Sequence, residues 1–453
     1  MNIIDTIKRH TVVVGKGSGV LVQAMTDEFS YIVTAKHNLQ IDVGNSESEL
    51  TQLENIEIKT FCGGVISANN IYPHPDEDAA IIEVDFIDDI LIHPYLESSV
   101  LDDKLYLYGY PGTRRRRQVD VSDWIGSYRL TVNDYSDTYF TFRNADAAPV
   151  EDVRGFSGGG LFIIDEYRNK AWLAGIENAM ENVQEAHERL KGIPIGIFNQ
   201  CLQDFNKPEI RPLHLSCFTK LQDEVFSLDK QGVMPFDVAK FDAVISFLKI
   251  EVSKSAGSVT HTPLEILKNN LEKFIVNGRN ASELENKEFW VSLLELIALD
   301  ILCKDLEVVS LEWESYFNEF FKEYRVIYIE TEKDWKDYFQ NILTTNTDGL
   351  SDKGKIILLV GKGPLPHYQF SQEIIDTCIE NISNVDGQGG IDNALRIQRH
   401  FPVIHLVSLH NHCIFSNVDI FSDINSISKQ PENLSFLKQH YRPILCENGE
   451  EHG

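Results

Sequence analysis

The sequence predicts a multidomain protein with an all-β first part, a helical region and, last, a small α/β domain. Three observations support this prediction. At 453 residues, the chain is long enough for two or three domains, each with its own core. Short apolar runs separated by turn residues dominate the first two hundred residues, and longer runs with apolar residues at helical spacing follow. Beyond residue 323, strand-like and helix-like runs alternate.

The composition is that of an ordinary globular protein, with 43% hydrophobic and 24% charged residues. The formal net charge is −28, and both halves of the chain are acidic, which argues against a large nucleic-acid interface or binding to an anionic membrane. No run approaches the roughly 18 apolar residues that a membrane helix needs, and residues 1–10 do not resemble a secretory signal. The seven scattered cysteines predict reduced thiols in a cytoplasmic protein. We expect no cofactor.

About a dozen short β-type runs fill the first two hundred residues, and no strong amphipathic helix interrupts them before the one predicted at Asn182–Lys191. This density of strands predicts a sandwich or barrels rather than a parallel βαβ fold. The predicted strands are Thr11–Gly15, Ser18–Gln23, Ser30–Ala35, Asn55–Phe61, Ala79–Val84, Lys104–Tyr110, Trp124–Thr131, Thr138–Asn144, Gly158–Ile164, Lys170–Ile176 and Ile193–Phe198.

Three local patterns in this region have the residue types of nucleophilic catalysis. Ser157 lies in the glycine-rich bend GFSGGG, His37 ends an apolar strand, and Asp78 directly precedes another. A serine hydroxyl is a poor nucleophile until a base such as histidine takes its proton, and a carboxylate can orient that base. Asp76 and Glu77 are alternatives for the carboxylate. Asp78 is favoured because the strand that follows would hold it in place.

Five short motifs occur together in a specific order, and they carry a resemblance. They are GSGVLV at residues 17–22, TAKH at 34–37, DAAI at 78–81, GYP at 109–111 and GFSGG at 155–159. With them, residues 10–205 resemble the trypsin-like (chymotrypsin-fold) serine peptidases. The resemblance implies two six-stranded barrels with the site between them. It also implies His37 as general base, Asp78 as orienting carboxylate, Ser157 as nucleophile, and the N–H groups of Gly155 and Ser157 as the oxyanion hole.

The same resemblance suggests substrate-binding residues. Glu151 lies six residues before the serine, where the family has the base of its primary pocket, and an acid there favours an Arg or Lys side chain. A solvated loop acid is an equal alternative for this position. Asn178 and Ala179 lie where the family's strand pairs with an extended peptide. Many secreted members have an aspartate where this chain has Phe156, so activation by a freed N-terminus is not expected.

Two further clusters have simpler interpretations. Arg114–Arg117 is the one strong basic run, and we interpret it as an exposed loop between strands. The group His405, His410, His412 and Cys413 is close enough in sequence to suggest a metal site. Strand alternation over Pro402–Leu409 would place these residues on different faces, so no metal is predicted.

Changes in pattern predict the domain boundaries. Residues 1–205 form the peptidase-like domain, 206–235 a linker with three prolines, 236–322 a helical region, 323–445 a small α/β docking or regulatory domain, and 446–453 a disordered tail. The predicted helices are Phe236–Val252, Thr262–Val276, Glu283–Leu302, Leu311–Lys322, Asp334–Leu343 and Gln372–Ile382, and the predicted strands of the last domain are Tyr324–Glu330, Lys355–Val360 and Pro402–Leu409.

This layout looks like the peptidase effector subunits of bacterial ABC-three-component (Lamassu-type) anti-phage systems. The likeness implies that the C-terminal region docks on a protein complex, with an SMC-like ATPase as the candidate partner. The sequence therefore predicts a cytoplasmic serine endopeptidase that acts on a protein or peptide and is regulated by its C-terminal region or a partner. The alternative is a catalytically inactive peptidase fold that serves as a scaffold for a protein partner.

Overall fold

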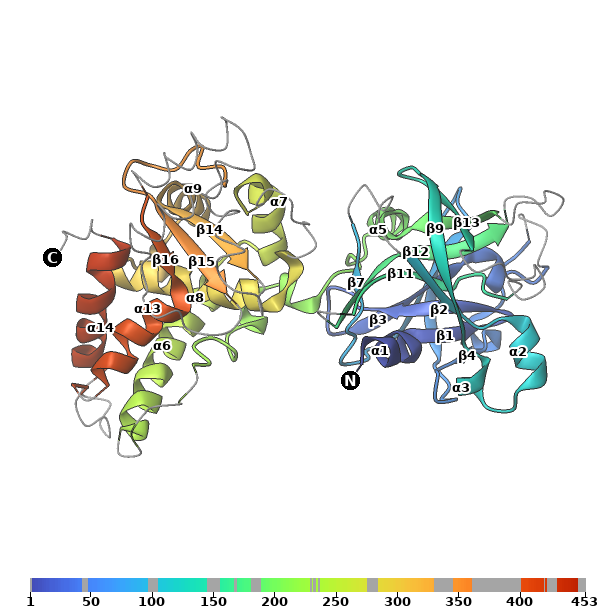
Figure 1. Ribbon diagram of the computed structural model, residues 1–453, viewed down its shortest axis with the longest axis horizontal. Coiled ribbons are helices and arrows are strands. Elements are labelled where there is room, and N and C mark those ends of the chain that lie inside the picture. The colour runs from blue at the N-terminus through green and yellow to red at the C-terminus, as the bar shows by residue number, and fades with distance from the viewer. Residues whose placement is uncertain are drawn as a thin grey trace, which may run out of the picture. The chain divides into compact units, whose positions relative to one another are not determined.

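The computed structural model describes residues 2–42, 48–96, 105–144, 155–166, 169–180, 189–228, 230, 234, 237–274, 284–329, 345–360, 401–418, 420–421 and 430–446. The chain divides into two compact units, Met1–Leu213 and His214–Gly453. Figure 1 shows that the first is built mainly of strands, whereas the second has helices around a small sheet.

The first sheet of the first unit is antiparallel and curled, with the strand order β4-β1-β2-β3-β6-β5. Its strands are β1 (Thr11–Val14), β2 (Gly17–Val22), β3 (Phe29–Ala35), β4 (Ile58–Lys59), β5 (Ala68–Pro73) and β6 (Ala79–Asp85). All residues of β1 and β2 are buried, which explains why their sequences are almost continuously apolar instead of alternating. The short helix α1 (Ile3–His10), which the sequence did not predict, precedes β1.

The second sheet closes into a barrel. Its strands are β7 (His93–Pro94), β8 (Leu105–Gly109), β9 (Gly126–Tyr135), β10 (Phe140–Asn144), β11 (Gly160–Asp165), β12 (Lys170–Met180) and β13 (Arg189–Pro194). Pairing follows the order β11-β8-β9-β10-β13-β12, and β12 pairs again with β11, so these six strands form a ring. Buried aromatic and aliphatic side chains, among them Phe140, Phe142 and Leu161, form a core cluster of this barrel. The predicted fold class, an all-β double barrel followed by helices and a small α/β part, is confirmed.

Two predictions near the end of the second barrel are wrong. The strand predicted at Ile193–Phe198 ends at Pro194, and helix α5 (Ile195–Asp204) begins there. Proline has no N–H to continue a sheet but suits the start of a helix, and the buried residues of α5 recur at helical spacing. The last part of the helix predicted at Asn182–Lys191 belongs instead to β13, whereas residues 181–188 lie outside the described residues.

The run Asn55–Phe61 forms less strand than predicted. Only Ile58–Lys59 pairs, as β4, and a 3₁₀ turn occupies Leu53–Asn55. In a second turn, the Gly63 N–H donates a hydrogen bond to the Thr60 carbonyl. The glycine pair after Cys62 permits this reversal, and Gly63 has a positive φ of +83°. The strand therefore ends where the turn begins.

Much of the predicted linker 206–235 is packed rather than free, and the boundary between the two units falls within it, after Leu213. Before the boundary, Ile210 is buried and its N–H donates to Asn199 at 2.7 Å. After it, Phe218 and Phe226 are buried in the second unit, and the Phe226 N–H donates to the carboxylate of Glu295. The prolines interrupt regular structure here, but the apolar residues between them still require a core.

The second unit contains a three-stranded parallel sheet in the order β14-β15-β16, flanked by helices (Figure 1). The strands are β14 (Tyr324–Ile329), β15 (Lys355–Val360) and β16 (Val403–His405). The main helices are α6 (Val238–Ser258), α7 (Pro263–Phe274), α8 (Lys287–Cys303), α9 (Trp313–Glu323), α13 (Leu406–Cys413) and α14 (Gln430–Leu445). In α8, thirteen of the seventeen residues are buried, so this helix is the centre of the unit.

The predicted strand Pro402–Leu409 is wrong beyond His405. The His405 Nδ1 accepts the N–H of Ser408 at 3.1 Å and so caps helix α13, where the sequence suggested a continued strand. His410, on that helix, is fully buried and lies 2.9 Å from the Tyr441 hydroxyl and 3.2 Å from the Glu295 carboxylate. Among the described residues, no group of three His, Cys, Asp or Glu side chains could hold a metal ion.

Several predictions fall outside the described residues. They are the helices at 334–343 and 372–382 and all but the first residue of the tail 446–453. Within the described part of the chain, no helix has the length and apolar character to cross a membrane. The described cysteines are free thiols.

Candidate active site

The bend around Ser157 requires glycine at two positions. Gly155 has a φ of +100° and Gly158 one of +83°, which side chains other than glycine rarely adopt. Space is also lacking, because a Cβ at Gly155 would lie 2.6 Å from the Gly112 nitrogen and one at Gly158 would overlap the Ser18 carbonyl oxygen. The glycines noted in the sequence are therefore needed for the shape of the bend that presents Ser157.

An aromatic side chain holds this bend in place. Phe156 is completely buried in the core of the second barrel, with its ring centroid 5.3 Å from that of Tyr128. Gly109 and Gly126 are close enough to the ring that a Cβ on either would approach it to less than 3 Å. An aspartate at this position would need a cationic partner, whereas Phe156 is held by apolar packing.

The structure brings His37, Asp78 and Ser157 into one hydrogen-bonded line. His37 Nδ1 lies 2.7 Å from Asp78 Oδ2, and Ser157 Oγ lies 2.8 Å from His37 Nε2. The His37 N–H also donates to Asp78 Oδ1 at 2.9 Å, so the carboxylate holds both the main chain and the ring of the histidine. Side-chain exposures of 26% for His37 and 32% for Asp78 leave the group accessible.

Strand pairing explains why the first two of these residues meet. Ala35 at the end of β3 pairs with Ala79 at the start of β6. Residues just beyond these paired ends must be neighbours, and the Lys36 N–H donates to the Asp78 carbonyl at 3.2 Å. His37 follows in a 3₁₀ turn over Lys36–Leu39. A histidine after one strand and an aspartate before its antiparallel neighbour therefore predict their contact.

Sequence reasoning missed two residues that fasten the serine bend to the first sheet. The Ser18 N–H donates to the Ser157 carbonyl at 2.7 Å, and the Ser18 hydroxyl donates to the Gly155 carbonyl at 3.1 Å. The Asn38 side chain donates to the same Ser157 carbonyl at 2.8 Å and to Thr34 Oγ1 at 3.1 Å. The glycine at position 17 could have indicated the role of Asn38, because a Cβ on residue 17 would overlap the Asn38 amide.

The N–H groups of Gly155 and Ser157 were predicted to be oxyanion donors. Neither has an acceptor among the residues that the structure describes. The neighbouring N–H groups are engaged: Gly158 donates to the Glu177 carbonyl at 2.6 Å and Gly159 to the Phe156 carbonyl at 2.5 Å. The Phe156 N–H between them also has no acceptor among the described residues, so three successive N–H groups of this bend are unengaged there.

The predicted substrate-binding residues have different outcomes. The Ser157 hydroxyl also lies 3.1 Å from the Asn178 carbonyl, so Asn178 adjoins the serine. Ala179 pairs with Lys191 of β13, on one side of β12. Strand β11 pairs with β12 only as far as Ile176, so β12 has no strand on its other side from Asn178 to Met180 in the described part of the chain. Glu151 lies outside the described residues.

A buried carboxyl group adjoins this site. Glu177 is 3% exposed, and burial, with a further contribution from the charge of Asp78, raises the pKa of its carboxyl to about 8. Its Oε2 has no hydrogen-bond partner in the described part of the chain. The buried Asn178 Oδ1 likewise has no hydrogen-bond partner among the residues that the structure describes. Sequence reasoning missed Glu177, because a single acid in a strand is an ordinary feature.

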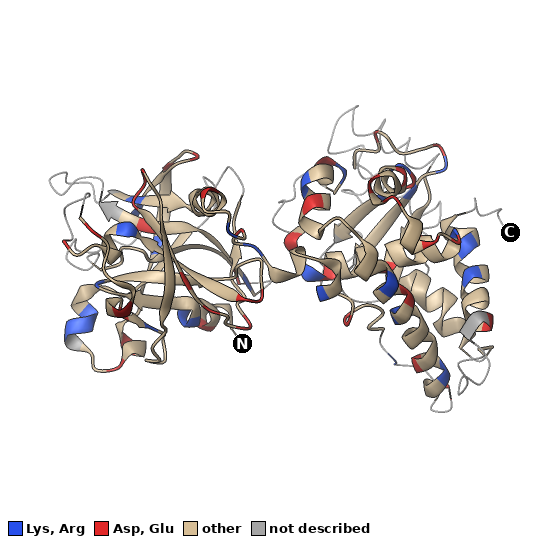
Figure 2. Ribbon diagram, turned by 180° about the vertical axis from the view of Figure 1, so that it is seen from behind, with Lys and Arg blue, Asp and Glu red and all other residues tan. Residues whose placement is uncertain are grey.

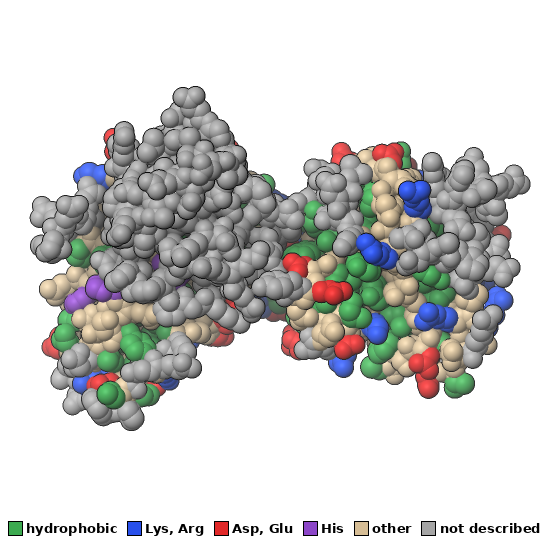
Figure 3. Space-filling model, in the orientation of Figure 1, with side chains coloured by type: hydrophobic (Ala, Val, Ile, Leu, Met, Phe, Trp, Pro, Cys, Tyr) green, Lys and Arg blue, Asp and Glu red, His purple; other side chains and the backbone are tan. Residues whose placement is uncertain are grey.

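The basic run Arg114–Arg117 is not the exposed loop that was expected. It forms helix α2 (Gly112–Arg117), whose basic residues are blue at the left of Figure 2. The Arg115 guanidinium donates to the carbonyls of Tyr110 at 2.9 Å, Gly15 at 3.2 Å and Gly17. One arginine of the run therefore joins the segment after β8 to the turn between β1 and β2. On the face drawn in Figure 3, the basic side chains of the first unit are mixed with acidic and apolar ones.

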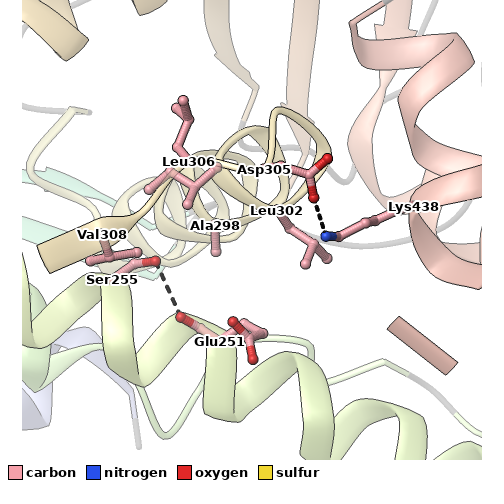
Figure 4. Close-up of a pocket in the computed structure, with 9 residues that line it drawn as sticks. Glu251, Ser255, Ala298, Leu302, Asp305, Leu306, Val308 and Lys438 are labelled. Atoms are coloured by element: carbon pink, nitrogen blue, oxygen red, sulfur yellow. Dashed lines mark hydrogen bonds and ion pairs between the residues drawn. The ribbon is translucent and has the colours of Figure 1, made fainter. Parts of the chain in front are cut away.

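A small cavity of about 200 Å³ lies in the second unit, between α6, α8 and α14 (Figure 4). Of its charged lining residues, Lys438 contacts the Asp305 carboxylate, which Arg442 also contacts, and Glu251 pairs with Lys254. Lys438 and Arg442 lower the pKa of Asp305. Ser255 donates to the Glu251 carbonyl at 3.1 Å.

A closed antiparallel barrel, a second curled sheet and a Ser-His-Asp line together define the class of the first unit. This is the fold of the chymotrypsin-type serine peptidases. Residues 192–415, just under half of the chain, match the family model of "C-terminal domain 4 of the ABC-three component (ABC-3C) systems". The second half of the chain is therefore similar to a domain of these systems, which confirms the resemblance noted in the sequence.

Two solved structures are among those similar to this chain. The inactive form of the Rv3671c protease has a TM-score of 0.31 and 16% identity, over 45% of this chain and 91% of that chain. The inactive form of a serine-to-alanine mutant of Rv3671c from M. tuberculosis H37Rv has a TM-score of 0.32 and 15% identity, over 45% and 90%. At these values, the fold assignment rests on the strand pairing described above. No curated protein sequence matches this chain.

Proposed function

We propose that the chain is a serine endopeptidase in which His37, Asp78 and Ser157 form the catalytic triad. The observation that carries this proposal is the unbroken line of hydrogen bonds from Asp78 Oδ2 through both nitrogens of His37 to Ser157 Oγ, at 2.7 and 2.8 Å. Such distances are within the reach required for proton transfer between a nucleophile and its base.

In this proposal, His37 Nε2 takes the proton of Ser157 as Oγ attacks the carbonyl carbon of a peptide bond. Asp78 accepts the Nδ1–H, which fixes the tautomer of the ring and stabilises the imidazolium that forms. The N–H groups of Gly155 and Ser157 bind the negative oxygen of the tetrahedral intermediate; one such donor contributes about 3 to 4 kcal/mol in well-studied cases. His37 then gives its proton to the leaving amine, and water repeats the sequence on the acyl-enzyme.

The Ser157 hydroxyl has two acceptors but one proton, since Asn178 O lies 3.1 Å away and His37 Nε2 lies 2.8 Å away. A peptide that pairs with the free edge of β12 would bring an N–H to the Asn178 carbonyl. With that carbonyl occupied, the serine proton is directed to His37. Substrate binding would thus favour the reactive arrangement.

The test is hydrolysis and labelling by wild type and Ser157→Ala. Wild type should cleave peptides and react with a fluorophosphonate at Ser157, whereas the variant should lose roughly 10⁴- to 10⁶-fold in kcat. Unchanged thermal unfolding of the variant is the control for folding. Activity that persists in Ser157→Ala would refute the assignment of the nucleophile.

We further propose that this peptidase acts within an ABC-three-component system, as a cytoplasmic effector of bacterial anti-phage defence. The similarity of residues 192–415 to a domain of such systems supports this part. The second unit would dock on the other components, including an SMC-like ATPase, and couple them to the peptidase. Co-expression of the full chain with those components should give a complex that co-purifies through size exclusion. Elution as separate proteins would count against it.

The alternative is a peptidase fold that binds a partner without cleaving it. The contact of the Ser157 hydroxyl with Asn178 O favours this reading, because a hydroxyl that donates there does not donate to His37. Fluorophosphonate labelling distinguishes the two functions. A scaffold stays unlabelled even with every component of the complex present, whereas an enzyme becomes labelled.

A further inference from the structure

Helices α8 and α14 of the second unit are fastened to each other where they end. The Arg442 Nε donates to the Cys303 carbonyl at 2.7 Å, and the same guanidinium contacts the Asp305 carboxylate just beyond α8. The Cys446 N–H donates to the Arg442 carbonyl at 2.8 Å. Arg442 thus links the main chain at Cys303 to the main chain at Cys446, although the two cysteines are far apart in sequence.

A second contact brings the two cysteines together. The Tyr324 hydroxyl lies 2.8 Å from Asp300 Oδ1 on α8 and 3.1 Å from the carbonyl of Leu445, the residue before Cys446. A side-chain hydrogen bond joins the thiols of Cys303 and Cys446. Cys303 is 1% exposed, whereas Cys446 is partly exposed. The pair therefore has one thiol that a dissolved oxidant can reach and one buried thiol directly behind it.

The surroundings of the two thiols give them different roles. The hydrogen bond from the Cys303 thiol lowers the pKa of the Cys446 thiol, and the Lys304 ammonium lowers it further, against the effects of burial and of the Asp300 and Glu323 carboxylates. The same hydrogen bond, together with burial, raises the pKa of Cys303. Since the thiolate is the form that attacks an oxidant, Cys446 is the thiol that reacts first. Cys303 is placed to react with the product.

We propose that Cys446 and Cys303 are an oxidation site, at which hydrogen peroxide converts the two thiols to a disulfide that ties the end of α14 to the end of α8. The Cys446 thiolate attacks one peroxide oxygen, the O–O bond breaks, and Cys446 becomes a sulfenic acid as water leaves. The Cys303 sulfur then attacks the sulfenic sulfur, and a second water leaves as the S–S bond forms. The two thiols lose two electrons and two protons in all, which reduce the peroxide to two molecules of water. A dithiol reductant reverses the change.

The experiment treats the full chain with hydrogen peroxide and analyses a digest made without reductant by mass spectrometry. Wild type should give one linked pair of peptides, holding Cys303 and Cys446, which dithiothreitol separates. Cys303→Ala should stop at a sulfenic acid on Cys446, which dimedone labels. Cys217→Ser removes another partly exposed thiol and is the matched control, so it should keep the link. The proposal is overturned if wild-type Cys446 collects dimedone without linking to Cys303, stays unoxidised, or links to a different cysteine.

A stability measurement distinguishes a pair that the fold holds together from two thiols that meet only when the unit opens. A disulfide that fits the folded state restricts the unfolded chain, so the melting temperature of the second unit should rise by roughly 5 to 15 °C on oxidation of wild type. Cys446→Ser, treated with peroxide in the same way, should show no rise. A fall in the melting temperature of the linked wild type would mean that the link strains the fold, which contradicts the proposal. Neither measurement needs peptidase activity, so this inference stands or falls separately from the proposed function.

Discussion

Phe156 packs against Tyr128 with ring centroids 5.3 Å apart, and this contact ties the residue before the candidate nucleophile to strand β9 of the closed barrel. The conformation of the serine bend therefore depends on packing inside one barrel rather than on an ion pair to a new N-terminus. If the proposed function holds, we expect control of the activity to come from elsewhere, with the second unit as the candidate.

Replacing Phe156 with alanine should destabilise the first unit by about 3 to 5 kcal/mol, because the ring is fully buried and its loss leaves a cavity. Any peptidase activity should fall as well, since the bend loses its anchor. Phe205→Ala, at a ring that is 43% exposed, is the control and should cost less. Urea denaturation of the three proteins measures the effect, and equal midpoints for the two variants would contradict it.

Asp78→Asn should lower kcat by about 10⁴-fold, because the amide favours the wrong tautomer of His37 while keeping the shape of the side chain. Asp76→Asn removes an exposed acid two residues away and should leave kcat within a few-fold of wild type. Steady-state kinetics with one peptide substrate compares them. If the two variants lose activity equally, the carboxylate has been assigned to the wrong residue.

Arg115→Ala should lower the free energy of unfolding by about 1.5 to 3 kcal/mol, because the guanidinium donates to three backbone carbonyls that would be left without it. Arg116→Ala, at an exposed position of the same helix, should change stability by no more than about 0.5 kcal/mol. Thermal unfolding distinguishes the two. A similar loss in both variants would mean that the charge of the run, not this contact, matters.

The pH dependence of the free energy of unfolding should reveal the ionisation of the Glu177 carboxyl. Its carboxyl has a pKa of about 8 in the folded state against an ordinary value of 4.5, so the folded state holds the proton more tightly than the unfolded one. Between these values, stability falls as pH rises, by at most about 1.4 kcal/mol per pH unit. Glu177→Gln cannot ionise and escapes this loss, so its stability relative to wild type should increase from about pH 5 to pH 8. A constant difference over this range would contradict the prediction.

The contact between His37 and Asp78 could be predicted because it follows from short-range patterns. Each residue lies at the end of an apolar strand, and antiparallel pairing of those strands makes their ends neighbours. The bend around Ser157 could be predicted from its glycines in the same way, since the positive φ of Gly155 and Gly158 restricts the residue type. The order of elements and the change of fold class within the predicted linker follow from hydrophobic periodicity.

Other features depend on partners that are distant in sequence and leave no local pattern. Ser18 and Asn38 look like ordinary polar residues until the fold places them on the Ser157 carbonyl. The predictions for Arg114–Arg117 and for the run after His405 were wrong for the same reason. Arg115 donates to the carbonyl of Gly15, which is distant in sequence, and His405 caps a helix where a strand was predicted to continue.

The sequence by itself determined the fold class, the residue types of the candidate site and the position of the serine bend, because strand periodicity and the backbone freedom of glycine are local properties. The tertiary structure alone decided that Ser157 Oγ lies 2.8 Å from His37 Nε2, and that Glu177 is buried with no hydrogen-bond partner for its Oε2 among the described residues. Burial and charge pairing depend on everything that packs around a side chain, and that is set only when strands far apart in sequence are brought together.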